Sequence, residues 1–181
     1  NYFKAMAKKV AVVAVDPVNG CGLFQYLEAF YENGIPYRVY AAAETTRIRT
    51  NSGVKLETDD VIANLKGHED EFDALVFSCG DAVPVFQQHA DEPYNIDLME
   101  VLKTFGEKGK ILIGHCAAAM LFDFAGITTG KKVAVHPLAK GAIQRGQATD
   151  EASVIDGNLC TARDENHIWT MLPEAVKMLK D

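Results

Sequence analysis

The sequence predicts an α/β protein, built on one doubly wound, mostly parallel sheet with helices on both faces. Short apolar runs alternate with amphipathic helical segments along the chain, which is the pattern of repeated βαβ units. The apolar runs are almost uninterrupted, as expected for strands that are covered on both faces. A length of 181 residues fits one domain, which we place at residues 8–181. Residues 1–7 are expected to be a cloning remnant or a disordered N-terminus.

The first half of the chain supplies three buried strands and one long helix. Residues 9–15 are an apolar run typical of a strand, and a turn rich in Pro, Asn and Gly follows it. From Leu23 to Tyr31 apolar side chains recur at helical spacing, and Gly34 stands where a helix C-terminal glycine belongs. Three elements complete this half: a strand at 37–42, a β-hairpin excursion over 48–57 and a strand at 73–77.

The second half of the chain continues the alternation. A long connection over 82–94 leads to an amphipathic helix at 96–108, which Gly109 ends. A strand at 110–113 then passes directly into a short apolar helix at 117–125. Three elements complete the chain: a strand at 132–135, a hairpin over 154–160 turned by Asp156-Gly157, and a helix over 166–180 with Asn166 as its expected N-cap.

Composition narrows the function classes. The chain has 25 acidic residues against 18 Lys and Arg, a formal charge of −7, so we expect no nucleic-acid partner, because that affinity rests on clustered positive charge. No apolar run reaches the ~18–20 residues of a membrane span and no signal segment opens the chain, so we predict no membrane partner and a cytoplasmic location. Four cysteines without close pairs predict reduced thiols, with neither a metal site nor a cofactor.

Reactive side chains cluster at the predicted strand ends. In open α/β sheets, ligands bind outside the carboxyl ends of the strands. Cys79 follows the third strand, His115 and Cys116 follow the fourth, and His136 follows a later one. Cys21 comes one loop after the first strand. We therefore expect a site at Cys116, with the other residues as its neighbours.

Cys116 is the strongest candidate for a nucleophile. The strand at 110–113 leads through Gly114 into a helix of small residues with no loop between them, which is the arrangement of a nucleophile elbow. The backbone N–H groups and dipole at a helix start stabilise a thiolate. The alternative, a buried cysteine packed as a small hydrophobe, fits this placement less well.

The sequence resembles the ThiJ/PfpI superfamily, which includes the Parkinson-associated protein deglycase. Three segments carry the resemblance: His115-Cys116-Ala117 after a hydrophobic strand, the run KVAVHPLAK at 132–140, and the hairpin VIDGNLCTAR at 154–163. It extends from about Lys8 to the C-terminus. The resemblance implies a flavodoxin-like, class I glutamine amidotransferase-like fold.

The same resemblance implies a function and a set of site residues. Cys116 falls on the family's reactive cysteine, the N–H groups of Gly80 and Ala117 on its oxyanion donors, and His136 on the histidine beside the cysteine. The family implies hydrolase- or lyase-type attack on a small carbonyl or acyl substrate, protease-family and stress-response members, and a homodimer.

The chain also departs from the family's pattern. Cys21-Gly22 stands where the family carries an acidic residue near the first helix, and the next acid is Glu28. Ser78-Cys79-Gly80 replaces Pro-Gly-Gly at the third strand, and the histidine next to Cys116 precedes it. Leu138 stands at the third position of the His-x-Glu expected of a glutamine amidotransferase, which argues against that activity.

Several roles stay open at this stage. His136 is either a general base for Cys116 or a cap for a helix that begins near Pro137. Cys21 and Cys79 are candidates for a resolving thiol or, with a histidine, for zinc ligation. Three further residues either line the pocket or lie on solvated surface: Asp81, His89 and Trp169.

Three functions also stay open. The first is an enzyme in which Cys116 attacks a small carbonyl or acyl carbon, and the preference for it is slight. The second is a non-catalytic oxidative-stress protein that senses through oxidation of Cys116. The third is a ligand-binding module on the same fold.

Overall fold

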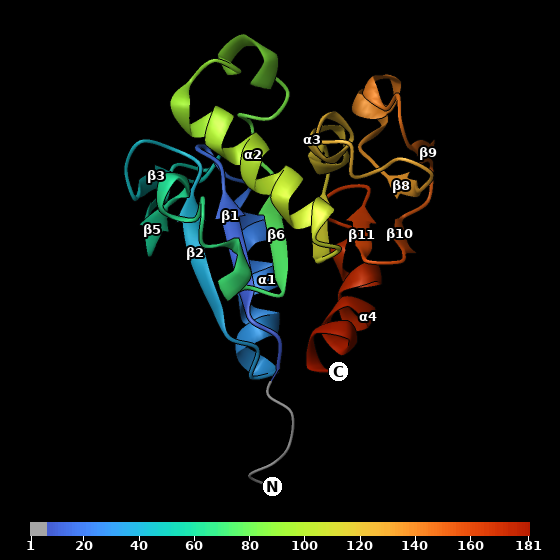
Figure 1. Ribbon diagram of the computed structural model, residues 1–181, viewed down its shortest axis with the longest axis horizontal. Helices are drawn as coiled ribbons and strands as arrows, with labels where there is room; N and C mark the ends of the chain where they lie inside the picture. The colour runs from blue at the N-terminus through green and yellow to red at the C-terminus, as the bar shows by residue number, and fades with distance from the viewer. Residues whose placement is uncertain (1–6) are drawn as a thin grey trace, which may run out of the picture.

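The computed structural model describes residues 7–181. The expectation for residues 1–7 therefore lies outside the described residues, except at Ala7. A seven-stranded sheet forms the centre of the molecule, in the order β10-β11-β7-β6-β1-β2-β5 (Figure 1). All neighbours in it are parallel except β10 and β11. The predicted doubly wound, mostly parallel sheet is confirmed.

The elements alternate along the chain as the sequence predicts. The sheet consists of β1 (Val10–Ala14), β2 (Tyr37–Ala41), β5 (Asp60–Val61), β6 (Ala74–Ser78), β7 (Ile111–His115), β10 (Ser153–Asp156) and β11 (Leu159–Ala162). The helices are α1 (Gly20–Glu32), α2 (Pro93–Glu107), α3 (Ala118–Phe124) and α4 (Ile168–Lys180). Four short 3-10 turns are η1 (Ile62–Asn64), η2 (Glu69–Glu71), η3 (Phe86–His89) and η4 (Pro137–Ala142). Two small sheets pair β3 (Arg47–Arg49) with β4 (Lys55–Glu57), and β8 (Lys132–Ala134) with β9 (Gln147–Thr149).

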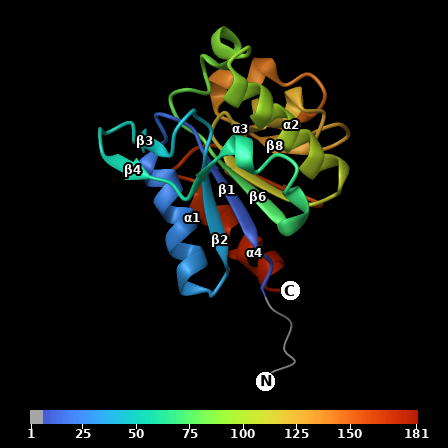
Figure 2. The same cartoon turned by 60° about the vertical axis from the view of Figure 1, so that its left-hand side comes forward.

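Helices cover both faces of the sheet. α1 and α4 lie on one face, and α2 and α3 on the other (Figure 2). Strand β1 shows why its sequence is apolar throughout: Val10 and Val12 pack under α1 and α4, whereas Ala11 and Val13 pack on the opposite side. Burial on both faces leaves no position for a polar side chain.

The ends of the first helix follow from local chemistry. The Asn19 side chain accepts a hydrogen bond from the Gly22 N–H at 2.6 Å, an N-cap contact that satisfies one free donor of α1. Gly34 takes a φ of 65° just beyond the helix, as its sequence position predicts. Tyr31, which we expected on the apolar face, is 78% exposed.

The structure shows three features that differ from the sequence prediction or that it did not include. β8 lies outside the central sheet, because side chains take two of its N–H groups: Lys132 donates to Asp156 Oδ2 at 2.9 Å and Ala134 to Thr161 Oγ1 at 2.8 Å. β5 and β9 were not predicted, since two or three residues carry no periodic signal. Asn166 is not the N-cap of α4; the helix begins at Ile168 after His167, and that cap makes no side-chain bond. None of the helices within residues 7–181 is long and apolar enough to cross a membrane.

Candidate active site

Cys116 lies at a sharp junction between β7 and α3. Its φ angle is 61°, in the left-handed region that costs a residue with a side chain about 1–2 kcal/mol. Two hydrogen bonds hold this conformation: the Cys116 N–H donates to the Ala162 carbonyl at 3.0 Å, and the Cys116 carbonyl accepts from the His136 N–H at 2.9 Å. This is the geometry of a nucleophile elbow, and it places the half-buried thiol in a crevice.

Small side chains make the elbow sterically feasible. A Cβ on Gly114 would lie 2.6 Å from the Ala118 Cβ and 3.0 Å from the Phe122 ring. Any larger residue at position 114 would push α3 away from β7. The run of small residues that suggested the elbow in the sequence is therefore a packing requirement of the turn.

The crevice lies at the carboxyl ends of β6 and β7 and has a volume of about 400 Å³. Its lining residues are Asn19, Asn51, Cys79, Gly80, Asp81, Pro84, His115, Cys116, His136, Asp164, Glu165 and Asn166. The structure thus brings together most of the residues singled out from the sequence. Cys21, His89 and Trp169 do not line the crevice; Cys21 is exposed on α1 and Trp169 is 68% exposed on α4.

Two backbone N–H groups lie beside the thiol and have no oxygen as hydrogen-bond acceptor among the described residues. Within residues 7–181, the N–H groups of Gly80 and Ala117 donate to no backbone or side-chain oxygen. Position 80 must be glycine, because a Cβ there would collide with the Pro17 carbonyl and lie 2.6 Å from Val18 Cα. The β1–α1 turn is bound to the same place, since the Asn19 N–H donates to the Cys79 carbonyl at 2.9 Å.

A second thiol, Cys79, lies beside Cys116 in the crevice and favours its ionisation. Hydrogen bonding from the Cys79 thiol is the largest influence and lowers the pKa of Cys116; burial opposes it, and the Ala117 N–H supports it. The same hydrogen bond, followed by burial, raises the pKa of Cys79 well above its ordinary value. Of the two thiols, Cys116 is therefore the one that ionises first. We expected the helix start to be the main cause, and a neighbouring thiol is the larger one.

His136 makes the capping contact that the sequence left as one of two alternatives. Its Nδ1 accepts a hydrogen bond from the Leu138 N–H at 3.1 Å, at the start of η4. In the neutral ring the proton is then on Nε2, so the side chain can donate a hydrogen bond but has no free nitrogen to accept a proton. Within residues 7–181 no hydrogen bond joins this ring to the Cys116 thiol.

The imidazole of His115 fills the space in front of Gly22. A Cβ on Gly22 would collide with His115 Nε2, so the acid of the family's pattern cannot fit beside this histidine. His115 Nδ1 lies 3.0 Å from the Tyr26 hydroxyl oxygen, and burial lowers the pKa of His115 to about 4. The ring is therefore neutral at pH 7. Its Nε2 is buried without a hydrogen-bond partner among the described residues.

Two acidic residues at the crevice were not singled out as site residues. Asp164 and Glu165 follow β11 and line the crevice beside Cys116, where each acts to raise the thiol pKa. Asp164 Oδ1 also accepts a hydrogen bond from the Asn166 N–H at 2.9 Å. Asp164 and Glu165 could have been predicted from their position just after a strand, which is how Cys79 and Cys116 were identified.

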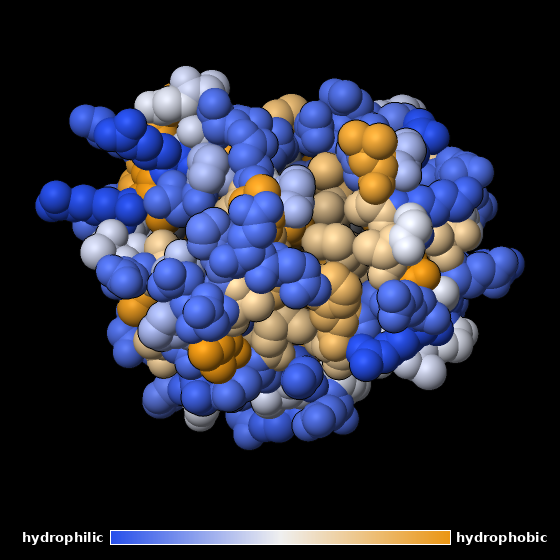
Figure 3. Space-filling view, turned by 90° about the horizontal axis from the view of Figure 1, so that it is seen from above, coloured by the Kyte–Doolittle hydropathy of each residue, from blue (hydrophilic) through white to orange (hydrophobic). Residues whose placement is uncertain are grey.

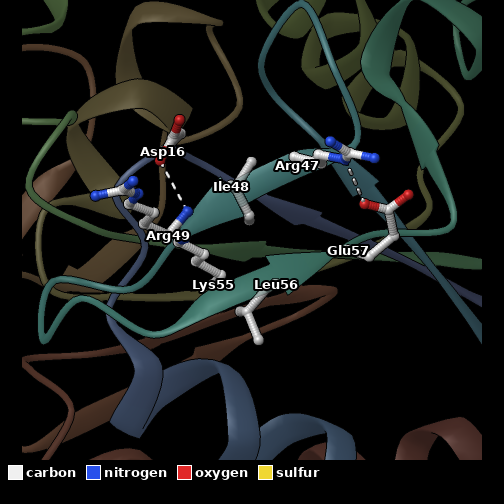
Figure 4. Close-up of a pocket in the computed structure, with 7 residues that line it drawn as sticks. All are labelled: Asp16, Arg47, Ile48, Arg49, Lys55, Leu56 and Glu57. Carbon is white, nitrogen blue, oxygen red and sulfur yellow. Dashed lines mark hydrogen bonds and ion pairs between the residues drawn. The ribbon is translucent and has the colours of Figure 1, made fainter.

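Further hollows lie near the crevice and beside the hairpin. A groove of about 370 Å³ shares Cys116 with the crevice and is lined mainly by apolar atoms of Met120, Leu138, Ala139 and Ala142. Apolar side chains also form a strip between hydrophilic margins on the face seen from above (Figure 3). A hollow of about 540 Å³ lies beside the β3–β4 hairpin, where Arg47 pairs with Glu57 at 3.5 Å (Figure 4); it contains no thiol.

Within residues 7–181 no three His, Cys, Asp or Glu side chains are placed to hold a metal ion.

The chain is similar to known proteins along nearly its whole length. The sequence pattern of the DJ-1/PfpI family matches residues 8–178. Protein ppBat of Bacteroides thetaiotaomicron is 77% identical over 175 residues, which cover 97% of this chain and 100% of that protein. Deglycase TK1284 of Thermococcus kodakarensis is 25% identical over 175 residues, which cover 95% and 99% respectively. The crystal structure of the putative protease I from Bacteroides thetaiotaomicron matches with a TM-score of 0.95 at 76% identity, covering 96% of this chain and 99% of that chain.

Proposed function

The chain belongs to the DJ-1/PfpI family, and from that premise we propose that it is an enzyme whose Cys116 thiolate attacks the carbonyl carbon of a small aldehyde or acyl compound. The observation that carries this proposal is the placement of Cys116. A thiol held at a φ of 61°, with a lowered pKa, opens onto a crevice beside the N–H groups of Gly80 and Ala117, which donate to no oxygen among residues 7–181. Backbone strain of this kind is characteristic of catalytic sites.

The chemistry follows from these groups. The Cys116 sulfur forms a bond to the carbonyl carbon, and the carbonyl electron pair moves to its oxygen. The N–H groups of Gly80 and Ala117 are the donors for that oxyanion, and each such donor commonly contributes about 10²–10³ in rate. With an aldehyde, the oxyanion takes a proton from water and gives a thiohemiacetal. With an ester, it expels the alcohol and leaves a thioester, which water then hydrolyses to the acid and the free thiol.

No separate base is required for this attack. The hydrogen bond from Cys79 favours the Cys116 thiolate, and His136 has its Nδ1 occupied by the Leu138 N–H. We therefore assign His136 to donation from Nε2 and positioning. Amide hydrolysis also needs an acid for the leaving amine, and no histidine within residues 7–181 is hydrogen-bonded to the Cys116 thiol. An activated acyl group or an aldehyde fits the site better than a peptide.

The surroundings of the thiol indicate the kind of substrate. Asp164 and Glu165 border the crevice and disfavour an anionic compound near the thiolate. The adjoining groove is apolar, with Met120 and Leu138 in its lining. A neutral carbonyl compound with a short apolar group suits both features.

The acyl probe p-nitrophenyl acetate tests the proposal. Wild-type protein should release a rapid burst of p-nitrophenolate, equal to one acyl group per chain, followed by slower turnover. Cys116→Ser should abolish the burst, whereas Cys21→Ser, which changes an exposed thiol outside the crevice, should keep it. Equal release by wild type and Cys116→Ser would refute the proposal. A redox role of Cys116 remains the second candidate, and the position of Cys79 favours it specifically.

A further inference from the structure

The register of the sheet brings two thiols together. β6 and β7 are parallel neighbours, with Phe77 opposite Gly114. Cys79 and Cys116 each lie one residue beyond the ends of these two strands. Neighbouring strands are about 4.8 Å apart, and disulfides span Cα separations of about 4.4–6.8 Å. Both residues line the same crevice.

The two thiols differ in access to solvent. Cys79 is 2% exposed, among the core residues under α2 and α3, whereas Cys116 is half-buried at the crevice wall. A solute in the crevice can therefore reach the Cys116 sulfur first. The pKa values point the same way, since that of Cys116 is lowered and that of Cys79 is raised, each chiefly through the other.

The remaining thiols lie elsewhere. The Cys21 sulfur is on the exposed first turn of α1, where it accepts from Gln25 Nε2 at 3.4 Å. Cys160 is buried on the opposite face of the sheet, 3.9 Å from the Met178 sulfur. Neither lines the crevice. The four cysteines therefore include one pair at the crevice and two thiols outside it.

We propose that Cys79 is a resolving thiol, and that this pair reduces hydroperoxides by forming a Cys79–Cys116 disulfide. The Cys116 thiolate attacks one peroxide oxygen, so an S–O bond forms, the O–O bond breaks, and the hydroxide or alkoxide that leaves takes a proton from water. The Cys79 sulfur then attacks the resulting sulfenic acid, an S–S bond forms, and water leaves with the Cys79 proton. The two thiols supply both electrons. A dithiol reductant regenerates the pair by exchange.

This inference rests on the proposed nucleophilicity of Cys116 and adds regulation to it. In the disulfide, Cys116 is no longer a thiolate and cannot act as a nucleophile toward a carbonyl carbon, so the carbonyl chemistry stops until the bond is reduced. The disulfide also intercepts the sulfenic acid before further oxidation to a sulfinic acid, which thiols do not reverse.

Peroxide treatment of the full chain, followed by peptide mapping by mass spectrometry without reduction, tests the inference. Wild type treated with equimolar hydrogen peroxide should yield a linked Cys79–Cys116 peptide that is two hydrogens lighter than its parts, and dithiothreitol should reverse it. Cys79→Ser should form no such peptide and should accumulate Cys116 sulfinic acid. Cys21→Ser and Cys160→Ser should behave like wild type.

Measuring iodoacetamide alkylation on the same samples distinguishes failure of this inference from failure of the proposed function. Rapid alkylation of Cys116 together with sulfinic acid and a free Cys79 in wild type would overturn this inference and leave the proposed function standing. Alkylation of Cys116 no faster than that of the exposed Cys21 would overturn both. The wild-type peptide map decides the matter even where Cys79→Ser does not fold.

Discussion

Replacing Cys79 by alanine should slow the reaction of Cys116 with alkylating agents at neutral pH. The thiolate, not the thiol, is the nucleophile. The Cys79 thiol is the largest influence that lowers the pKa of Cys116, so its removal raises that pKa and leaves a smaller thiolate fraction. At high pH both proteins are fully ionised, and the difference should disappear.

The size of the effect follows from the strength of one hydrogen bond. A hydrogen bond to a charged group contributes about 1.5–3 kcal/mol. A thiol is a weak donor and Cys116 is only half-buried, so we take the lower end of that range. About 1.4 kcal/mol corresponds to a tenfold change in the ionisation equilibrium, and we expect alkylation near pH 7 to be about tenfold slower in Cys79→Ala.

The assay is the second-order rate of iodoacetamide alkylation of Cys116 as a function of pH. Cys79→Ser is the matched control, because its hydroxyl keeps a donor beside Cys116 and should preserve most of the wild-type rate at neutral pH. Cys21→Ala controls for the exposed thiol. If Cys79→Ala and wild type react equally fast at pH 7, the origin that we assign to the low pKa of Cys116 is wrong.

Three further predictions concern the packing, protonation and backbone conformation around Cys116. Gly22→Ala should destabilise the protein by about 1–3 kcal/mol in urea unfolding, the usual cost of overpacking, because its Cβ collides with His115 Nε2 and also lies 2.7 Å from Asn19 Oδ1; the cost should be smaller in a His115→Ala background, and equal costs in both would contradict the collision with the ring. The pKa of His115 is lowered to about 4, so on acidification the unfolded chain, with an ordinary histidine pKa of about 6.5, binds the proton first. Stability should be full above pH ~6.5 and fall by about 3 kcal/mol towards pH ~4 before it levels off, and an NMR titration of the ring with a midpoint near its ordinary value would exclude this. Finally, Cys116→Gly should be about 1 kcal/mol more stable to urea than Cys116→Ala, because only glycine escapes the cost of a φ of 61°; a less stable glycine variant would speak against strain at the elbow.

The sequence alone predicted the features that depend on residues close to one another along the chain. The strand at 110–113, the small residues after it and the position of Cys116 all lie within one short segment, so the elbow could be predicted from local packing. Gly80 came from the family resemblance, not from local packing. The central sheet followed from the alternation of apolar runs and helical segments.

Features that depend on contacts across the fold could not be predicted. The ring of His115 on β7 fills the space beside Gly22 on α1, where the family's pattern has an acid. Neither segment alone indicates this replacement. The effect of Cys79 on Cys116 depends on the pairing of β6 with β7. Asp164 was not singled out because the sequence shows β11 only as part of a hairpin, whereas the parallel pairing of β11 with β7 places the residues after it at the edge of the site.

The most direct test of the account is to locate the covalent intermediate. After brief exposure to p-nitrophenyl acetate at neutral pH and acid quenching, peptide mapping should find one acetyl group on Cys116 of wild-type protein, and the group should disappear as turnover proceeds. Acetyl groups confined to Cys21 or surface lysines, with Cys116 unmodified, would contradict the claim that Cys116 is the nucleophile.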